Sequence, residues 1–234
     1  MRGFYKPAEV VERVNGRGGE LQLQRRGRDY EFIYGGSFLM SSYNGVTERD
    51  MVRQAIRVCS LAAGSGEPGL RVLIGGLGFG IGLQEALGSP QVKRVDVVEI
   101  EEAVVRWNRG PLAEINGNAL SDPRVNIFVT DLVEFLVKPP DSGVDREGYY
   151  HAAILDTDNG PGWLSRPSNS FLYSDKGTAL IKSLLKPEGA VLSVWSESAN
   201  DAYQALLKKY FKTVAEKKGY EKTGESSFYY LAQI

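Results

Sequence analysis

The sequence holds very little cysteine and histidine. Cys59 and His151 are the only residues of their kinds among 234. A single cysteine cannot form an intramolecular disulfide, and the two residues together cannot build a Cys/His cage, so we expect no metal. Long apolar runs are missing too, since stretches such as Val72–Ile74 and Ala152–Leu155 are far shorter than the roughly 20 residues of a membrane-spanning helix.

An excess of charge of one sign is also missing. The chain has 28 Lys and Arg against 29 Asp and Glu, which gives a net charge of −1. Such a balance argues against bulk attraction to nucleic acid or to anionic membranes. Residues 1–7 show neither the apolar core nor the cleavage pattern of a signal peptide. We therefore expect a cytoplasmic globular protein whose partner is a small molecule, with no nucleic acid and no membrane among its partners.

The first part of the chain reads as a β-hairpin. Apolar and polar residues alternate over 21–25, a second apolar run covers Tyr30–Tyr34, and a glycine-containing turn lies between them. Glycine, serine and asparagine over 35–45 predict a loop. From Thr47, which we expect to cap a helix, apolar residues recur at helical spacing as far as Cys59. These changes divide the chain into an N-terminal hairpin region, residues 1–46, and an α/β domain, residues 47–234.

The rest of the α/β domain alternates short apolar strands with helices. Alternation of this kind predicts a doubly wound, mostly parallel, seven-stranded sheet with helices on both faces, whose ligands bind at the carboxyl ends of the strands. The predicted strands are Arg71–Ile74, Val95–Ile100, Val125–Val129, Ala152–Leu155 and Ala190–Trp195, the predicted helices are Ile81–Leu87, Glu101–Asn108, Leu132–Val137, Thr178–Leu185 and Ala202–Tyr210, and Phe211–Ala215 with Phe228–Ile234 form a closing antiparallel hairpin.

A glycine loop follows the first of these strands. Gly76, Gly78 and Gly80 allow positive φ and close approach of a ligand, next to the N–H groups that open a helix. Their spacing fits neither the dinucleotide fingerprint nor a P-loop. A tight structural turn would explain the glycines as well as a nucleoside site does. Glu99 favours the nucleoside site, because it ends the next strand, where an acid can accept hydrogen bonds from both ribose hydroxyls.

Two later strands also end in acids. Asp131 follows the third strand, and it could hold an adenine amino group or simply cap the next helix. Asp156 ends the fourth strand, where a catalytic carboxylate would lie, although the Asn159–Pro161 segment is also ordinary turn chemistry. The long segment Gly160–Tyr173 predicts a lid that excludes water. His151, at the start of this strand, is expected at the surface or at an interface, and Cys59 in the core.

Several stretches, taken together, resemble the spermidine synthase family, which has the fold of class I S-adenosylmethionine-dependent methyltransferases. They are Thr47–Asp50, Val72–Gly80, Val98–Glu101, Asp122–Val125 with Asp131, Ile154–Asp156 and Leu185–Gly189. The resemblance implies that the glycine loop and Glu99 bind the methionine-derived tail and the ribose, that Asp131 holds the adenine, and that Asp156 activates the acceptor. It also implies a homodimer that pairs through the N-terminal hairpin.

The sequence departs from the family where the family binds a polyamine. The aspartate of the family's glycine loop falls on Gly78, the second acid of D-x-x-D on Asn159, and the glutamine after the fifth strand on Trp195. Each lost carboxylate removes a charge-assisted hydrogen bond worth about 1.5–3 kcal/mol, so a conventional putrescine site is not expected. We assign to the acceptor pocket Asp158, Asn159, Trp163, Tyr173 and Trp195.

These features predict a transferase. The preferred interpretation is methyl transfer from S-adenosylmethionine to a small acceptor, with Asp156 as the base, because Gly78 leaves room for the carboxylate of the full donor. The alternative is an aminopropyltransferase that makes a polyamine from decarboxylated S-adenosylmethionine, with Asp156 and Asp158 as its acid pair. A second alternative is a nucleoside-binding protein without catalysis.

Overall fold

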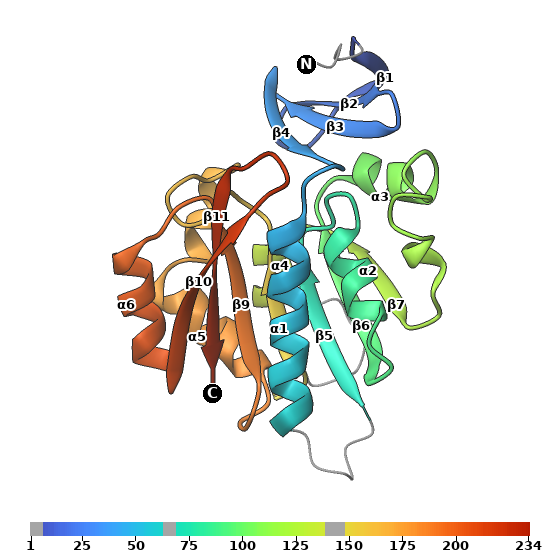
Figure 1. Cartoon of the computed structure of the whole chain (residues 1–234). Coiled ribbons are helices and arrows are strands. Elements are labelled where there is room, and N and C mark those ends of the chain that lie inside the picture. The colour runs from blue at the N-terminus through green and yellow to red at the C-terminus, as the bar shows by residue number, and fades with distance from the viewer. Residues whose placement is uncertain (1–6, 63–68, 139–147) are drawn as a thin grey trace.

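The computed structural model describes residues 7–62, 69–138 and 148–234. A small antiparallel sheet lies over one end of an α/β domain (Figure 1). The small sheet has the order β1-β2-β3-β4, and its strands are Glu9–Asn15, Glu20–Arg26, Asp29–Tyr34 and Ser37–Ser41. The predicted hairpin is confirmed as β2 and β3, which pair antiparallel from Leu21 with Tyr34 to Arg26 with Asp29.

Strand β4 corrects the expectation of a loop over 35–45. Gly35 and Gly36 both have positive φ, and together they make a two-residue turn that pairs Tyr34 with Ser37. Glycines in this conformation close a hairpin well, so the glycine pair marks a turn between strands and not a longer loop. The division of the chain at residue 46 stays a prediction.

Helix α1 (Val46–Ala62) begins where a helix was predicted, but its cap was not foreseen. The backbone N–H groups of Gly45, Val46 and Thr47 donate to the carboxylate of Glu221, at 2.8, 2.9 and 3.1 Å. The Thr47 hydroxyl instead bonds the Ser227 hydroxyl at 2.7 Å. Burial opposes the charge of Glu221, yet these hydrogen bonds lower its pKa. A side chain 174 residues away therefore caps the helix, which no local pattern reveals.

The main sheet confirms the predicted fold class. Its seven strands have the order β10-β11-β9-β8-β5-β6-β7, and the sequence order reverses between β5 and β8. Strands β5 to β9 are parallel, and β11 pairs antiparallel with both β9 and β10. Their bounds are β5 Leu70–Gly75, β6 Val92–Glu99, β7 Val125–Val129, β8 Ala152–Leu155, β9 Val191–Ser196, β10 Thr213–Tyr220 and β11 Ser226–Gln233.

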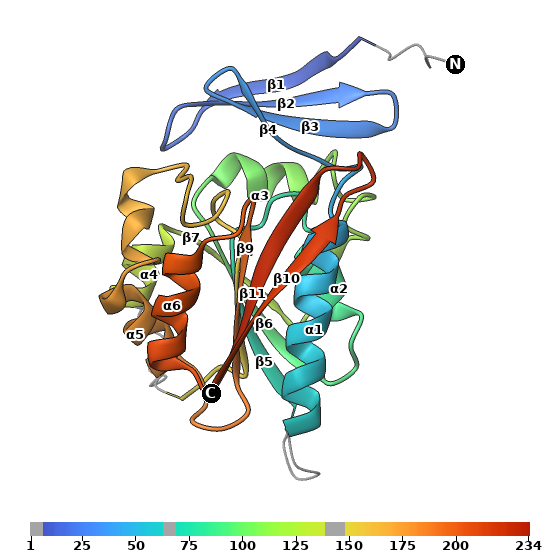
Figure 2. The same cartoon turned by 60° about the vertical axis from the view of Figure 1, so that its left-hand side comes forward.

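Helices cover both faces of this sheet (Figure 2). Successive strand residues alternate in direction, so Val72 joins the core on the side of α1 and α2, and Leu73 joins the core on the side of α4, α5 and α6. No helix in the described ranges is long and apolar enough to cross a membrane. The remaining helices are α2 Ile81–Leu87, α3 Glu102–Arg109, α4 Leu132–Val137, α5 Asp175–Leu184 and α6 Asp201–Tyr210, with short 3₁₀ turns η1 Ala119–Ser121 and η2 Pro167–Phe171.

The small sheet packs against the glycine loop through aromatic side chains. Phe32 of β3 stacks on Phe79 with ring centroids 4.2 Å apart, and it lies 5.5 Å from the ring of Trp107 in α3. All three rings are buried. The small sheet therefore covers the carboxyl ends of the parallel strands.

The predicted surface position of His151 is wrong. Its side chain is buried at the start of β8, and Nδ1 accepts a hydrogen bond from the Arg71 backbone N–H at 3.0 Å. Cys59 lies in the core as expected, where its thiol donates to the His151 carbonyl oxygen at 2.9 Å and burial raises its pKa to about 12. Because β8 is an interior strand of the sheet, even the residue before its first one is covered.

Candidate functional site

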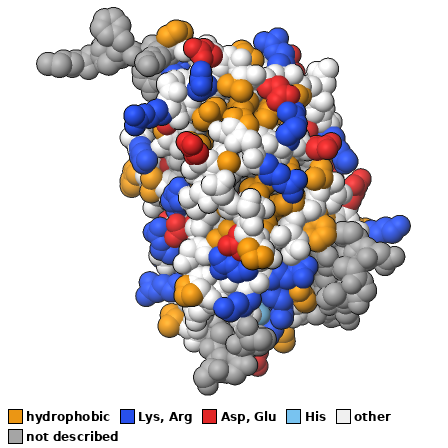
Figure 3. Space-filling model, turned by 90° about the vertical axis from the view of Figure 1, so that its right-hand side faces the viewer, with side chains coloured by type: hydrophobic (Ala, Val, Ile, Leu, Met, Phe, Trp, Pro, Cys, Tyr) orange, Lys and Arg blue, Asp and Glu red, His pale blue; other side chains and the backbone are white. Residues whose placement is uncertain are grey.

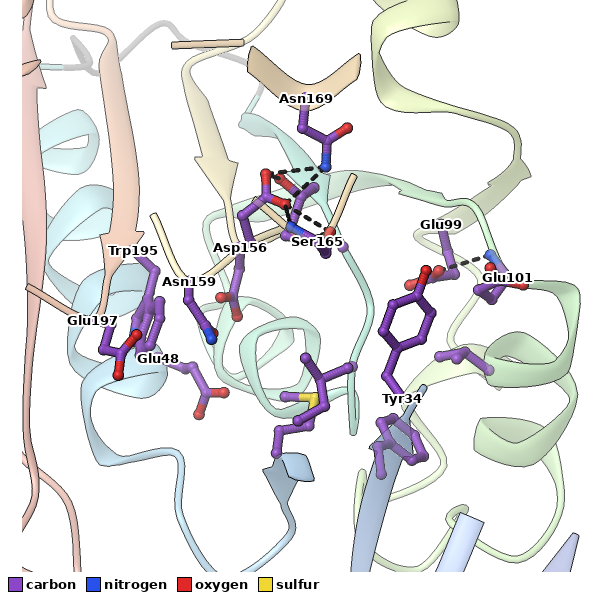
Figure 4. Close-up of a pocket in the computed structure, with 18 of the residues that line it drawn as sticks. Tyr34, Glu48, Glu99, Glu101, Asp156, Asn159, Ser165, Asn169, Trp195 and Glu197 are labelled. Carbon is purple, nitrogen blue, oxygen red and sulfur yellow. Dashed lines mark hydrogen bonds between the residues drawn. The ribbon is translucent and has the colours of Figure 1, made fainter. Parts of the chain in front are cut away.

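A cavity of about 910 Å³ opens at the carboxyl ends of the parallel strands. Its wall combines the glycine loop, the segments that follow β6, β7, β8 and β9, the start of α1, and side chains of the small sheet such as Tyr34, Phe38 and Met40 (Figure 4). This volume can enclose a nucleoside with a short chain. The cavity lies beside the point where strand order reverses, which is where the sequence predicted a ligand.

The glycine loop forms one wall, and two of its three predicted glycines line the cavity. Gly76 and Gly78 have φ of 92° and 50°. A Cβ at Gly76 would meet the backbone oxygen of Asp156, so only glycine lets the loop lie this close to the end of β8. Gly80 is not among the residues that line the cavity. A Cβ there would meet Asn108 and Asn116, so this glycine is needed for packing at the start of α2.

Glu99 is held by the glycine loop itself. Its Oε2 accepts the Leu77 N–H at 2.9 Å and its Oε1 accepts the Glu101 N–H at 2.8 Å. Burial raises the pKa of Glu99, and these two backbone hydrogen bonds work against that rise. Glu99 lines the cavity opposite Tyr34 (Figure 4). The carboxylate is therefore fixed in orientation with lone pairs left over for hydroxyl donors.

Asp131 fits both of its predicted roles. Its Oδ1 accepts the Val133 N–H at 2.7 Å and so caps α4, as expected. The same residue lines the cavity, whose wall also includes the apolar residues Leu132, Val98 and Val104. The cap is confirmed, and the contact with adenine stays a prediction.

Asp156 and Glu48 form a pair of carboxyl groups whose charge is disfavoured. In Figure 4 both side chains point into the same space, together with Asn159 and Glu197. Burial, followed by the charges of Asp158 and Glu221, raises the pKa of Asp156 to about 7. Burial, followed by the charges of Asp156 and Glu221, holds the pKa of Glu48 well above its usual value. Oε2 of Glu48 is buried without a hydrogen-bond partner among the described residues.

The wall of the cavity is strongly acidic. Among the described residues that line it, nine are Asp or Glu and one, Arg166, is basic. The outer surface differs, because positive and negative side chains are interspersed over much of the face drawn in Figure 3. An enclosed wall of one sign concentrates ions of the opposite sign. The nine acids are Glu48, Glu99, Glu101, Asp131, Asp156, Asp158, Glu197, Glu221 and Glu225.

This acidic wall is not built like a metal centre. In the part of the chain that the structure describes, no three His, Cys, Asp or Glu side chains converge as metal ligands would. The carboxylates are instead spread over the cavity wall, from the ends of β6 and β7 to the start of α1 and the turn between β10 and β11. The arrangement suits an elongated organic cation with more than one positive group.

Asp158 organises the predicted lid. Its carboxylate accepts the Ser165 N–H and hydroxyl at 2.8 and 2.6 Å, the Asn169 amide at 2.9 Å, and the Tyr173 hydroxyl at 3.1 Å. Four donor groups on three residues of one segment therefore converge on one buried acid. Asp158 lines the cavity as expected, but these hydrogen bonds take up its oxygens.

The same network corrects two of the predicted acceptor residues. Asn159 and Trp195 line the cavity, whereas Trp163 and Tyr173 do not. Asp158 draws Ser165 and Asn169 inward, so the tip of the loop turns out and leaves Trp163 46% exposed. Tyr173 contacts Asp158 through its hydroxyl but does not line the cavity itself.

Sequence reasoning missed several residues of the wall. Glu48 lies in the Thr47–Asp50 stretch, where it could have been considered because it is an acid within a family motif. Glu197 follows β9, and Glu221 and Glu225 come from the β10–β11 turn. Glu197 could have been found by its place directly after a parallel strand, as the other strand-end acids were. No local signal marks Glu221 and Glu225, because only the folded sheet brings their turn to the cavity.

The sheet order, the glycine loop and the acid at the end of β6 define a protein with the class I methyltransferase-like fold. Comparison with known families narrows this class. The Spermine/spermidine synthase domain matches residues 58–221, and the chain belongs to this family. The family resemblance of the sequence is therefore confirmed.

Curated relatives carry the name polyamine aminopropyltransferase. One from Prochlorococcus marinus (strain MIT 9312) is 32% identical over 147 residues, which is 60% of this chain and 48% of the relative. Polyamine aminopropyltransferase 2 of Bacillus cereus is 31% identical over 153 residues, 62% of this chain and 40% of the relative. The chain thus matches about half, or less, of the length of these proteins.

Solved structures agree on the fold. Spermidine synthase from Thermotoga maritima superposes with a TM-score of 0.75 and 18% identity, and the match covers 96% of this chain and 72% of that one. A spermidine synthase in complex with the transition state analogue AdoDATO gives a TM-score of 0.76 and 17% identity, covering 96% and 73%. At this identity the likeness concerns the fold alone.

Proposed function

We propose that this chain is an aminopropyltransferase, which moves the aminopropyl group of decarboxylated S-adenosylmethionine to an amine. The observation that carries the proposal is the acidic cavity, with the buried Glu48 beside Asp156. Donor and acceptor of this reaction are both cations with free amines, and carboxylates bind ammonium groups by charge-assisted hydrogen bonds. The family and the names of its curated relatives support the same choice. They favour the sequence's alternative over methyl transfer, its first preference.

The acids that the sequence lacks at Gly78 and Asn159 have replacements from other elements. Glu48 comes from α1, Glu197 from the end of β9, and Glu221 from the β10–β11 turn, and all three line the cavity. A cationic ligand would therefore meet carboxylates in this chain although two family positions have lost theirs. This is why the departures noted in the sequence do not argue against an amine substrate.

The donor would bind along the other wall. Glu99 would accept hydrogen bonds from the ribose hydroxyls, Asp131 from the adenine amino group, and Gly76 and Gly78 would allow the aminopropyl chain close to the backbone. The positions of these residues in the wall support these roles. In this arrangement the sulfonium end of the donor would point toward Asp156.

The chemistry is a displacement at carbon. The lone pair of an amine nitrogen attacks the aminopropyl carbon bonded to sulfur, a C–N bond forms, and the C–S bond breaks with its electron pair on sulfur, which leaves methylthioadenosine. The attacking nitrogen loses a proton to the carboxylate of Asp156. A base with a pKa of about 7 suits proton transfer at neutral pH, and the enclosed cavity aligns the two substrates.

The test is formation of methylthioadenosine from decarboxylated S-adenosylmethionine with putrescine, cadaverine, agmatine and spermidine as acceptors. Asp156→Asn should lower kcat by about 10²–10⁴-fold, while Glu114→Gln, at an exposed acid remote from the cavity wall, should leave it unchanged. A parallel assay follows S-adenosylhomocysteine from S-adenosylmethionine. Transfer of methyl alone would overturn the proposal, and binding of the nucleosides without any turnover would favour a non-catalytic protein.

The remaining expectations concern assembly and location. Val10, Val11 and Phe38 are 51%, 44% and 55% exposed on the small sheet, and these apolar side chains support a homodimer paired through that sheet. Analytical ultracentrifugation of the wild type and of Phe38→Ser would test it, because a monomeric wild type would exclude the dimer. Cytoplasmic location stays a prediction of the sequence.

A further inference from the structure

Arg166 is the exception in the acidic cavity. It lines the wall, yet no ion pair between described residues includes it. Its Nη1 is buried and has no hydrogen-bond partner within the described ranges. The Arg166 guanidinium thus lies in an acidic wall, yet its Nη1 donates no hydrogen bond to any described residue.

The position of Arg166 is fixed by its neighbours. Ser165 bonds Asp158 through its backbone N–H and its hydroxyl, and Asn169 bonds Asp158 through its side-chain amide. The Asn169 N–H also donates to the Arg166 carbonyl oxygen at 3.0 Å. Because residues on both sides are anchored to one buried acid, the guanidinium is presented to the cavity from a rigid segment.

A buried, charged donor without a partner is unfavourable, and most buried polar groups in proteins have a hydrogen-bond partner. Guanidinium groups pair best with carboxylates, which they bind through two parallel hydrogen bonds. We propose that Arg166 binds the carboxylate of a ligand whose ammonium group lies against the acidic wall. The cavity then takes a zwitterionic, amino-acid-like substrate. This inference rests on the proposed function, since the same wall must hold the amine.

Two substrates could supply the carboxylate. The acceptor could be a basic α-amino acid, in which the side-chain amine attacks the donor and the carboxylate lies on Arg166. Alternatively, the donor could keep its own carboxylate, for which Gly78 leaves room. The bonds made and broken are the same in both cases: C–N forms, C–S breaks, the electron pair stays on sulfur and one proton goes to Asp156.

The experiment measures Kd by calorimetry for ligand pairs that differ only by a carboxylate. The pairs are ornithine with putrescine, lysine with cadaverine, and S-adenosylmethionine with its decarboxylated form. In the wild type, the carboxylate-bearing member of an acceptor pair or of the donor pair should bind about 10- to 100-fold more tightly, as expected for one charge-assisted pair. Which pair shows the preference identifies the source of the carboxylate.

Variants test whether Arg166 causes the preference. Arg166→Gln should abolish it by weakening only the carboxylate-bearing ligand, and Arg166→Lys should keep part of it. Arg109→Gln, an exposed arginine in the last turn of α3, should keep all of it. Absence of any preference in the wild type, or an unchanged preference in Arg166→Gln, overturns the inference. If the Arg166 inference fails but the wild type still forms methylthioadenosine from the decarboxylated donor and a diamine, the proposed function stands. If the wild type neither binds these ligands nor turns them over, both the inference and the proposed function are wrong.

Discussion

Replacing Asp156 by Asn removes a carboxyl group whose charge the folded protein disfavours. The carboxyl lies in the cavity with Glu48, and burial together with Asp158 and Glu221 raises its pKa from 3.8 to about 7. In the unfolded chain the same group would ionise near its ordinary value. The folded state therefore holds a proton that the unfolded state gives up between these two pH values.

The sign and size of the effect follow from this difference. Below about pH 4 both states are protonated, and Asp156 costs no stability. As pH rises toward 7 only the unfolded state ionises, so the wild type loses stability until the folded carboxyl also ionises. A difference of about 3 pKa units corresponds to at most about 4 kcal/mol. Asn carries no charge at any pH, so Asp156→Asn should be more stable than the wild type at pH 8 by up to that amount, or on the order of 10 °C in Tm.

Urea and thermal unfolding at pH 5, 6, 7 and 8 measure the difference. The gain from Asp156→Asn should grow from pH 5 to about pH 7 and then level off, while Glu114→Gln, at an exposed acid, should stay parallel to the wild type. If the gain in unfolding free energy of Asp156→Asn is the same at pH 5 and pH 8, the folded protein does not raise the pKa of this carboxyl group and the reasoning is refuted. A gain in stability with loss of turnover would identify Asp156 as a group kept for function.

Three further predictions concern the same cavity. Binding of putrescine or another diamine should strengthen by up to tenfold per pH unit from pH 5 to 7 and then level off, since a cation binds best when Asp156 is ionised; calorimetry in two buffers should detect proton release, and equal Kd values at pH 5.5 and 7.5 would contradict this. Glu221→Gln should lower the free energy of unfolding by about 1–2 kcal/mol, because it weakens the cap of α1; an unchanged urea midpoint would show that the cap contributes nothing. Gly78→Asp restores the family's acid at a φ of 50°, which Asp tolerates, and the new side chain must displace the Met40 methyl group. This substitution should raise the preference for decarboxylated over full S-adenosylmethionine by about tenfold. An unaltered ratio of the two Kd values would argue that the amine of the donor lies elsewhere.

The sequence predicted those parts of the fold that depend on neighbouring residues. Apolar runs of four to six residues between helical patterns gave the central strands, and β7, β8, α2 and α4 begin and end where predicted. β4 was missed because a two-residue glycine turn was taken for part of a loop. His151 was misplaced because nothing in its surroundings along the chain reveals that β8 is a central strand covered on both faces.

The donor and acceptor sides of the cavity also differ in how well the sequence predicts them. The predicted donor residues Gly76, Gly78, Glu99 and Asp131 all lie at the ends of strands β5, β6 and β7, so topology alone brings them to one edge. The acceptor side draws on α1, on the segments after β8 and β9, and on a hairpin turn near the end of the chain. Its composition is decided by how these distant elements pack.

This difference explains why amine binding was judged too unfavourable from the sequence. The sequence argument considered only the family's motif positions, and two of these, Gly78 and Asn159, have lost their acids. The negative charge of Glu221 compensates for this loss, but it reaches the cavity only because the β10–β11 turn caps α1. That carboxylate is held in place by three backbone N–H groups and also raises the pKa of both Glu48 and Asp156. One contact thus starts the helix and adds negative charge to the site, and substitution of Glu221 should change stability and amine affinity together.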